Sequence, residues 1–203
     1  MHAHPDAILI TDRLQLRPAE PALAVPLAQF IQRNRTHFAP WEPPRSFDIE
    51  SAEAWVPRLL DAVAARAAGQ EVRWLLLPRA DDAAPAPVIG RINFTSIARG
   101  PFQSCALGYQ IDVAHEGRGL MREALSVAIA HLFGTLKLHR IEANYRPENV
   151  RSGALLARLG FVKTGLAPKY LFIDGDWRDH VQTQLINDAF DASVFGAAAS
   201  AAG

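Results

Sequence analysis

The stretch from Leu107 to Arg122 constrains the fold more than any other part of this chain. The β-favouring residues Tyr109, Ile111 and Val113 stand at alternate positions, which predicts a strand that ends at residue 113. The next residues, Glu-Gly-Arg-Gly over 116–119, contain a Gly-x-Gly turn, where the backbone can bend sharply and no side chain blocks a ligand. A strand that turns sharply at these glycines is therefore predicted.

A helix over 118–133 follows, because the apolar residues Leu120, Ala124, Val127 and Leu132 recur at helical spacing. The first N–H groups of a helix have no intrahelical partner and lie at the positive end of its dipole, so they suit an anion such as a pyrophosphate. Arg118 adds positive charge beside them. The alternative from these residues alone is an ordinary turn that binds nothing.

Size and composition favour a single globular domain with a real core, since the chain has 203 residues and 49% of them are hydrophobic. Its 21 basic and 21 acidic residues cancel, so general nucleic-acid affinity is not indicated. The single cysteine, Cys105, cannot form an internal disulfide, which favours a reducing compartment. We see no secretion signal and no membrane span, so we expect a cytoplasmic protein with no membrane contact.

The rest of the chain predicts a mixed α/β sheet in one domain over 8–187, between a loose leader at 1–7 and an Ala-rich disordered tail at 188–203. A turn-rich segment over 34–49 and a turn over 81–87 interrupt it. We expect a central parallel crossover through the helix of 118–133. The predicted helices cover 21–33, 51–68, 118–133 and 147–160, and the predicted strands 8–17, 72–77, 88–97, 103–113, 139–145, 161–166, 170–173 and 177–186.

Four motifs in this order resemble those of the GNAT superfamily of N-acetyltransferases. They are Glu116-Gly-Arg-Gly-Leu-Met121, Arg146-Pro-Glu-Asn-Val-Arg-Ser152 with the Leu155–Phe161 segment after it, Tyr170–His180, and Pro40-Trp-Glu-Pro43. The last two are similar to the ribosomal-protein-alanine N-acetyltransferase branch (RimJ/RimL type), and to its RimJ type most of all. The resemblance, which covers about 8–187, implies a GNAT-type acyl-CoA N-acyltransferase fold: a mostly antiparallel sheet with one central parallel crossover and flanking helices.

The resemblance also implies acetyl-CoA as cosubstrate. Ile111 and Val113 would pair their backbone with its pantetheine arm, and Asn149 and Ser152 would contact the arm further along. Glu116 replaces the usual Gln or Arg, so we expect its carboxylate to point away from the phosphates. The residues expected at the pyrophosphate are Gly117, Arg118, Gly119, Leu120 and Met121.

For catalysis, the resemblance implies that Ser152 protonates the departing thiolate. RimL-like members carry a glutamate as proposed base where this chain has Leu171, so that role does not transfer. We expect Glu42 to orient the amine, directly or through water. Trp41, Asn93, Tyr145 and Tyr170 are the other residues expected in the acceptor cleft.

Each of these residues also has a simpler interpretation. Asn149 fits a helix N-cap, and Ser152 a solvated or capping hydroxyl. Trp41 and Tyr145 fit core packing, and Glu42 a solvated loop carboxylate.

The missing strong base favours an acceptor that loses its proton easily. An α-amino group titrates near 8, so roughly a tenth of it is neutral at pH 7, against about 0.04% of a lysine side chain. We therefore expect a protein N-terminus as acceptor, with a ribosomal protein implied by the resemblance. Two alternatives stay open: a small-molecule amine, and a CoA-binding module without catalysis.

The remaining expectations concern metals and assembly. The seven histidines show no zinc-ligand spacing, so we expect no metal. We also expect no direct nucleic-acid binding and either a monomer or a homodimer.

Overall fold

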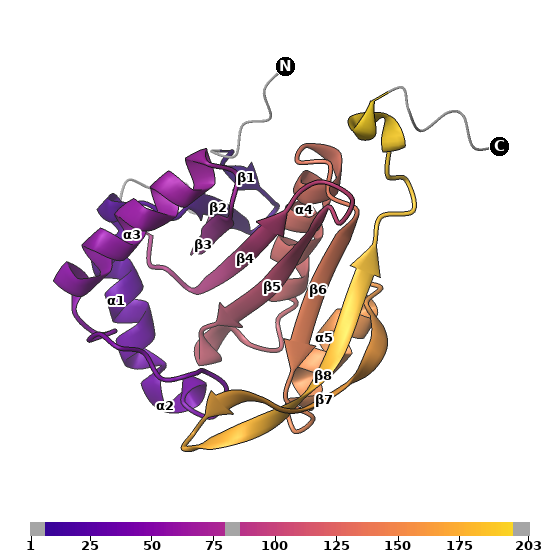
Figure 1. Cartoon of the computed structure of the whole chain (residues 1–203). Coiled ribbons are helices and arrows are strands. Elements are labelled where there is room, and N and C mark those ends of the chain that lie inside the picture. Colours follow the sequence, from indigo (N-terminus) through magenta and orange to yellow (C-terminus); the bar gives the residue numbers. More distant parts are fainter. Residues whose placement is uncertain (1–6, 80–85, 197–203) are drawn as a thin grey trace.

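A computed structural model describes residues 7–79 and 86–196, and these form one mixed sheet with helices around it (Figure 1). The strands are β1 (Leu9–Ile10), β2 (Leu14–Pro18), β3 (Val72–Pro78), β4 (Gly90–Ala98), β5 (Ser104–Ile111), β6 (Arg140–Tyr145), β7 (Val162–Ile173) and β8 (Asp176–Ile186). The α-helices are α1 (Ala24–Arg33), α2 (Arg35–Phe38), α3 (Ala52–Ala67), α4 (Leu120–Gly134) and α5 (Val150–Arg158). Short 3-10 helices are η1 (Pro21–Leu23), η2 (Val113–His115) and η3 (Ala192–Phe195).

The strand order β1-β2-β3-β4-β5-β6-β8-β7 confirms the predicted mixed sheet. Within the described chain every neighbouring pair is antiparallel except β5 and β6, which are parallel. Helix α4 provides the crossover between these two strands, as parallel neighbours require.

Two hydrophobic clusters cover opposite faces of the sheet. The larger cluster joins the sheet to α4 and α5, and Leu125, Leu132 and Leu156 belong to it. The smaller cluster joins α1 and α3 to β3, through residues such as Phe30 and Trp55. Figure 1 shows α1 and α3 gathered at the β2–β3 end, so no helix of the described residues covers that face of β6 and β8.

The strand predicted over 8–17 is wrong in part, because it is a hairpin of β1 and β2. The Thr11 hydroxyl accepts a hydrogen bond from Leu14 N–H, and Thr11 N–H donates to Leu14 C=O, which closes a turn at Asp12 and Arg13. Conversely, the two strands predicted over 161–166 and 170–173 are one strand, β7, with irregular pairing to β8 between Ala167 and Leu171.

The central strand ends two residues earlier than predicted, at Ile111. Asp112 caps η2 by accepting a hydrogen bond from Ala114 N–H, and this local bond competes with the strand ladder. Val113 therefore lies in η2 and not in β5. The turn-rich segment over 34–49 likewise contains a single helical turn, α2.

The predicted helix starts at Ser51 and Asn149 are confirmed by their caps. The Ser51 hydroxyl accepts from Ala54 N–H, and the Asn149 side chain accepts from Ser152 N–H. Pro57 lies inside α3.

Three expectations concern the ends and the loop. Most of the turn at 81–87, all but the last residue of the leader and residues 197–203 lie outside the described residues. Within the segment expected to be a disordered tail, η3 forms, and the Phe190 ring contacts the His139 ring at 5.3 Å. The domain boundaries stay a prediction.

No helix within the described ranges is long and apolar enough to cross a membrane.

Candidate active site

The site begins where β5 and β6 separate. Their pairing covers only Ser104–Ala106 and Arg140–Glu142, and beyond it the two strands diverge. A cleft of about 230 Å³ lies in this opening, lined by Leu107–Gln110 from β5, Ala143–Tyr145 from β6 and Arg146 directly after β6. A ligand in the cleft can therefore reach main-chain groups that no neighbouring strand occupies.

The cofactor loop, residues 112–119, has the backbone of an anion cradle. Gly117 and Gly119 have φ of 72° and 75°, which glycine adopts without strain, and Gly119 is the N-cap of α4. A Cβ at Gly117 would meet nothing within 4 Å, and one at Gly119 only an Arg13 guanidinium nitrogen at 3.7 Å. This open cradle at the first N–H groups of α4 fits a pyrophosphate.

The residues expected beside the cradle divide into core and exposed groups. The side chains of Leu120 and Met121 are buried in the larger hydrophobic cluster, so only their main chain can contact a ligand. The Arg118 side chain is exposed and forms no ion pair with a described residue, while its carbonyl accepts a hydrogen bond of 3.0 Å from Arg13.

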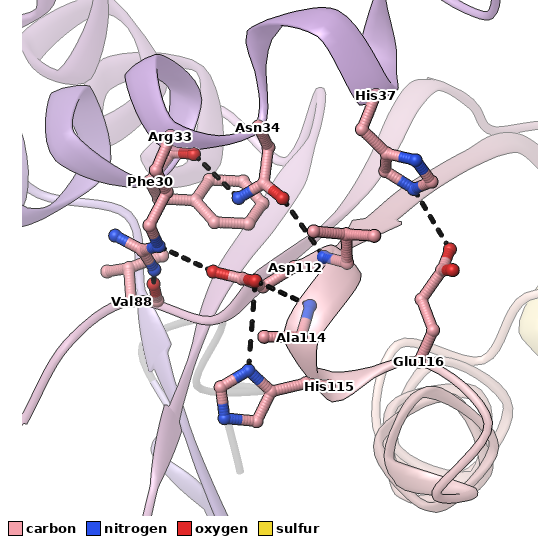
Figure 2. A network of polar contacts seen from close by, with 10 residues as sticks. Phe30, Arg33, Asn34, His37, Val88, Asp112, Ala114, His115 and Glu116 are labelled. Atoms are coloured by element: carbon pink, nitrogen blue, oxygen red, sulfur yellow. Dashed lines mark hydrogen bonds and ion pairs between the residues drawn. The ribbon is translucent and has the colours of Figure 1, made fainter.

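The α1–α2 segment anchors the start of the cofactor loop (Figure 2). The buried Asp112 carboxylate accepts from Arg33 Nε at 2.5 Å. Burial acts to raise the pKa of Asp112, but hydrogen bonds from Arg33, Ala114 and Asn34 hold it below its ordinary value. Residues far apart in sequence thus set the position of this loop.

The Asn34 side chain limits which main-chain groups of Val113 can bind a ligand. Its side chain is buried, donates to Phe30 C=O at 2.9 Å and accepts from Val113 N–H at 3.0 Å (Figure 2). The Val113 N–H is therefore already paired, and its carbonyl accepts from Glu116 N–H at 3.4 Å, so a pantetheine pairing at Val113 would have only the second lone pair of that carbonyl.

Ile111 is placed differently. Asp112 N–H donates to Ile89 C=O on the β4 side, and main-chain groups alternate between the two sides of a strand. The N–H of Ile111 therefore faces the opening toward β6.

Glu116 lies between α2 and α5. Its carboxylate forms a 3.0 Å contact with His37 Nε2 and an ion pair with Arg151 (Figure 2 shows the first contact). These two contacts hold the Glu116 carboxylate close to α2 and α5, the helices on either side of the loop.

The first turn of α5 brings Ser152 into the cleft. Asn149, the N-cap residue, also lines the cleft, so its capping role and a ligand contact are compatible. Ser152 Oγ lies 2.8 Å from the hydroxyl of Tyr109 on β5. Burial is the main cause that raises the pKa of Tyr109 to about 12, so the phenol keeps its proton at neutral pH.

Tyr109 is not among the predicted site residues, since its place in the alternating pattern predicts only a strand position. A buried tyrosine on the inward face of a strand needs a hydrogen-bond partner for its hydroxyl. This requirement is the feature of the sequence that could have indicated a polar partner for Tyr109.

Glu42 is held by two arginines. Oε1 accepts a hydrogen bond of 3.1 Å from Arg45 and another from Arg91, while within the described chain no group donates to Oε2. Burial is the main cause that lowers the pKa of Arg91 to about 10, and the Glu42 carboxylate opposes that shift. Oε2 is thus the free acceptor that Glu42 presents.

Of the other predicted acceptor residues, Trp41, Asn93 and Tyr145 line the cleft. The prediction for Tyr170 is wrong, because it does not line the cleft: its hydroxyl accepts from Asn144 Nδ2 at 3.0 Å, and its ring is 5.2 Å from that of His180. Asn144 and His180 are themselves lining residues.

His180 is a further residue that the sequence analysis missed. It is buried, and its Nδ1 lies 3.0 Å from Arg178 C=O. Because a carbonyl only accepts, Nδ1 carries a proton, and in the neutral imidazole Nε2 is then the acceptor. Only the tertiary structure brings this residue of β8 to the cleft.

Neither a cysteine nucleophile nor a metal group adds to this site. Burial raises the pKa of the Cys105 thiol to about 12, which keeps it protonated. The described residues contain no group of three or more His, Cys, Asp or Glu side chains that could hold a metal ion.

Comparison with known proteins agrees with this geometry. Residues 13–162 match the family model described as the acetyltransferase (GNAT) domain. The chain is 43% identical over 181 residues to the [ribosomal protein uS5]-alanine N-acetyltransferase of Escherichia coli (strain K12), covering 89% of this chain and 91% of that protein.

Two solved structures are also similar. The ribosomal-protein-S5-alanine acetyltransferase from Vibrio fischeri has a TM-score of 0.86 and 38% identity, covering 92% of this chain and 100% of that one. The RimJ of Mycobacterium smegmatis, in complex with CoA-disulfide, has a TM-score of 0.83 and 28% identity, covering 93% of this chain and 91% of that one. With its strand-to-helix glycine turn and divided sheet, the chain belongs to the GNAT acetyltransferase family.

Proposed function

We propose that the protein transfers an acetyl group from acetyl-CoA to the N-terminal α-amino group of a protein, in the cytoplasm and with a ribosomal protein as acceptor. The observation that carries this proposal is the 43% identity to a ribosomal-protein alanine N-acetyltransferase along nearly the whole of both chains. The glycine cradle and the RimJ relative bound to a CoA disulfide support the cosubstrate.

The charge of the cleft supports an α-amino acceptor. Three arginines, Arg45, Arg91 and Arg146, line it together with the single carboxylate of Glu42. This excess of positive charge disfavours a protonated amine. The difference between an α-amino group and a lysine side chain, about 2.4 pKa units, corresponds to roughly 3.3 kcal/mol in the free energy of supplying the neutral form.

The reaction would be a direct transfer within a ternary complex. Acetyl-CoA supplies an activated thioester carbonyl. The neutral amine forms the new C–N bond while the C–S bond breaks, and the departing thiolate takes the Ser152 proton, which Ser152 regains from water. With Tyr109 as the donor in the 2.8 Å contact between the two hydroxyls, the Ser152 proton is directed into the cleft.

The proton released by the amine needs an acceptor. Glu42 Oε2 and His180 Nε2 are the two cleft atoms suited to take it, directly or through water. The Ile111 N–H, facing the opening, suits the carbonyl oxygen on which negative charge develops.

An acceptor panel tests the proposal. Release of free CoA is measured with an alanine-initiated peptide, the same peptide with a blocked N-terminus and an internal lysine, and a set of small amines and polyamines. We expect modification of the free α-amino group alone, located by mass spectrometry. Turnover only with small amines would make the protein a small-molecule acetyltransferase, and binding of acetyl-CoA without any turnover would exclude an enzyme.

A further inference from the structure

A second cavity, of about 280 Å³, lies on the sheet next to the cleft. Its lining residues come from β6, β7 and β8 and are all polar: Arg140, Glu142, Asn144, Thr164, Gln182, Thr183 and Gln184. We call it the polar trough.

The trough opens on the face of the sheet that α4 and α5 do not cover. Along β6, Ile141, Ala143 and Tyr145 are buried in the larger cluster, so Arg140 and Asn144, at alternate positions, face the other way. Figure 1 shows no helix in front of β6 and β8 on that side.

The trough adjoins the cleft, because Asn144 lines both cavities. From Asn144 to Arg140 the strand runs four residues, about 13 Å at ~3.3 Å per residue. An extended peptide whose first residue occupies the cleft would cover the same length with about its next four residues.

Several polar groups of the trough have no partner within the described chain. The Gln182 side-chain amide makes no hydrogen bond, and Arg140 Nε is buried without one. Arg140 donates through Nη1 to Gln184 Oε1, which leaves the Gln184 amide N–H groups free. The Gln182 amide can both donate and accept, while Arg140 Nε and the free Gln184 N–H groups can donate to the carbonyls of a peptide main chain.

We propose that the polar trough binds the main chain of the acceptor polypeptide over the four or so residues that follow its N-terminal residue. The proposal rests on the proposed function and extends it, since it makes the acceptor an extended, unfolded N-terminal segment. Side-chain amides that contact the main chain hold the segment whatever its sequence. The enzyme thereby selects a free flexible terminus and discriminates against a small amine, which cannot reach the trough.

A peptide length series tests the proposal. Alanine-initiated peptide amides of two to eight residues, with one repeated polar sequence, are compared by kcat/KM with the full-length protein. We expect kcat/KM to rise about tenfold between two and five or six residues, as two or three hydrogen bonds form, and then to level off. Equal values at every length would overturn the trough and leave N-terminal acetylation standing, whereas no turnover with any peptide would overturn the proposed function.

A blocking variant tests the location. Gln182→Trp would fill the trough, and we expect it to reduce the ratio of kcat/KM between hexapeptide and dipeptide from about tenfold to about twofold. The matched control is Arg158→Trp, an exposed position at the end of α5, which should keep the full ratio. An unchanged ratio in Gln182→Trp would contradict the proposal.

A milder variant guards against misfolding. Gln184→Ala removes the free amide N–H groups, together with the Arg140 partner Oε1, without adding bulk, and we expect it to lower kcat/KM for the hexapeptide about threefold and for the dipeptide by much less. Equal effects on both peptides would show that the position acts on stability and not on the acceptor. Thermal melting of each variant accompanies the kinetics.

Discussion

At the scale of single residues, the pair formed by Ser152 and Tyr109 offers a direct test of the proposed acid. Tyr109→Phe removes the phenol hydrogen bond to Ser152 Oγ, and we expect kcat to fall about tenfold with KM for acetyl-CoA within about twofold. Ser152→Ala should lower kcat further, and Tyr109→Phe should add little to it because both act through one hydroxyl. Steady-state kinetics measure this; a normal rate in Ser152→Ala would remove the serine from the mechanism.

Glu42 has a structural role besides any part in catalysis. Glu42→Ala leaves the buried Arg91 guanidinium without its carboxylate, and we expect a loss of about 3 kcal/mol in the free energy of unfolding. The double variant Glu42→Leu with Arg91→Met removes both charges and should recover most of that loss. Urea denaturation measures both, and equal stability of Glu42→Ala and the native protein would show that this ion pair is weak.

At the scale of elements, the start of α4 depends on Gly119. Gly119→Trp places a large side chain in the cradle at a left-handed backbone position, and we expect it to abolish acetyl-CoA binding. Gly100→Trp is the matched control: φ is 67°, nothing lies within 4 Å of its Cβ position, and it sits in the β4–β5 turn. Calorimetric titration compares the two, and unchanged affinity in the first would refute the cradle.

Helix α5 packs closely against the sheet because residue 153 is a glycine. A Cβ there would meet the Tyr145 ring at 2.8 Å, so Gly153→Ala must displace that ring or the helix turn that carries Ser152. We expect lower thermal stability and a lower kcat, although alanine favours a helix by about 1 kcal/mol over glycine. Gly134→Ala, where nothing lies within 4 Å, is the control and should not lower stability.

At the scale of the whole molecule, two carboxylates connect segments distant in sequence. Asp112 holds Arg33 of α1, and Glu123 of α4 accepts from Thr11 and Arg13 in the β1–β2 turn. Burial acts to raise both pKa values, but these hydrogen bonds hold them below the ordinary 3.8 of Asp and 4.5 of Glu.

Lowered folded-state pKa values mean that this stabilisation is complete above the ordinary values and is lost as the pH falls through the folded-state ones. We therefore expect the melting temperature to fall as the pH is lowered from about 5 to 3. The variant with Asp112→Asn and Glu123→Gln should show a lower melting temperature at pH 6 and a shallower decline. Parallel curves for the two proteins would contradict this assignment.

The sequence alone predicted the elements that rest on local chemistry. The helix caps at Ser51 and Asn149, the glycine turn at 117–119 and the parallel crossover through α4 all follow from short-range patterns. It failed where a local hydrogen bond changed the backbone, as at the Thr11 turn and the Asp112 cap that ends β5.

Tertiary structure alone decided which distant side chains meet. The opening between β5 and β6 brings Tyr109 to Ser152 and Arg91 to Glu42, and it places His180 of β8 beside them. The placement of α4 and α5 on the opposite face of the sheet leaves the polar trough open next to the cleft. Hydrophobic periodicity predicts which face of a helix or strand is buried. The residues that pack against that face depend on the order of the strands in the sheet and on where two strands separate, and both are properties of the folded chain.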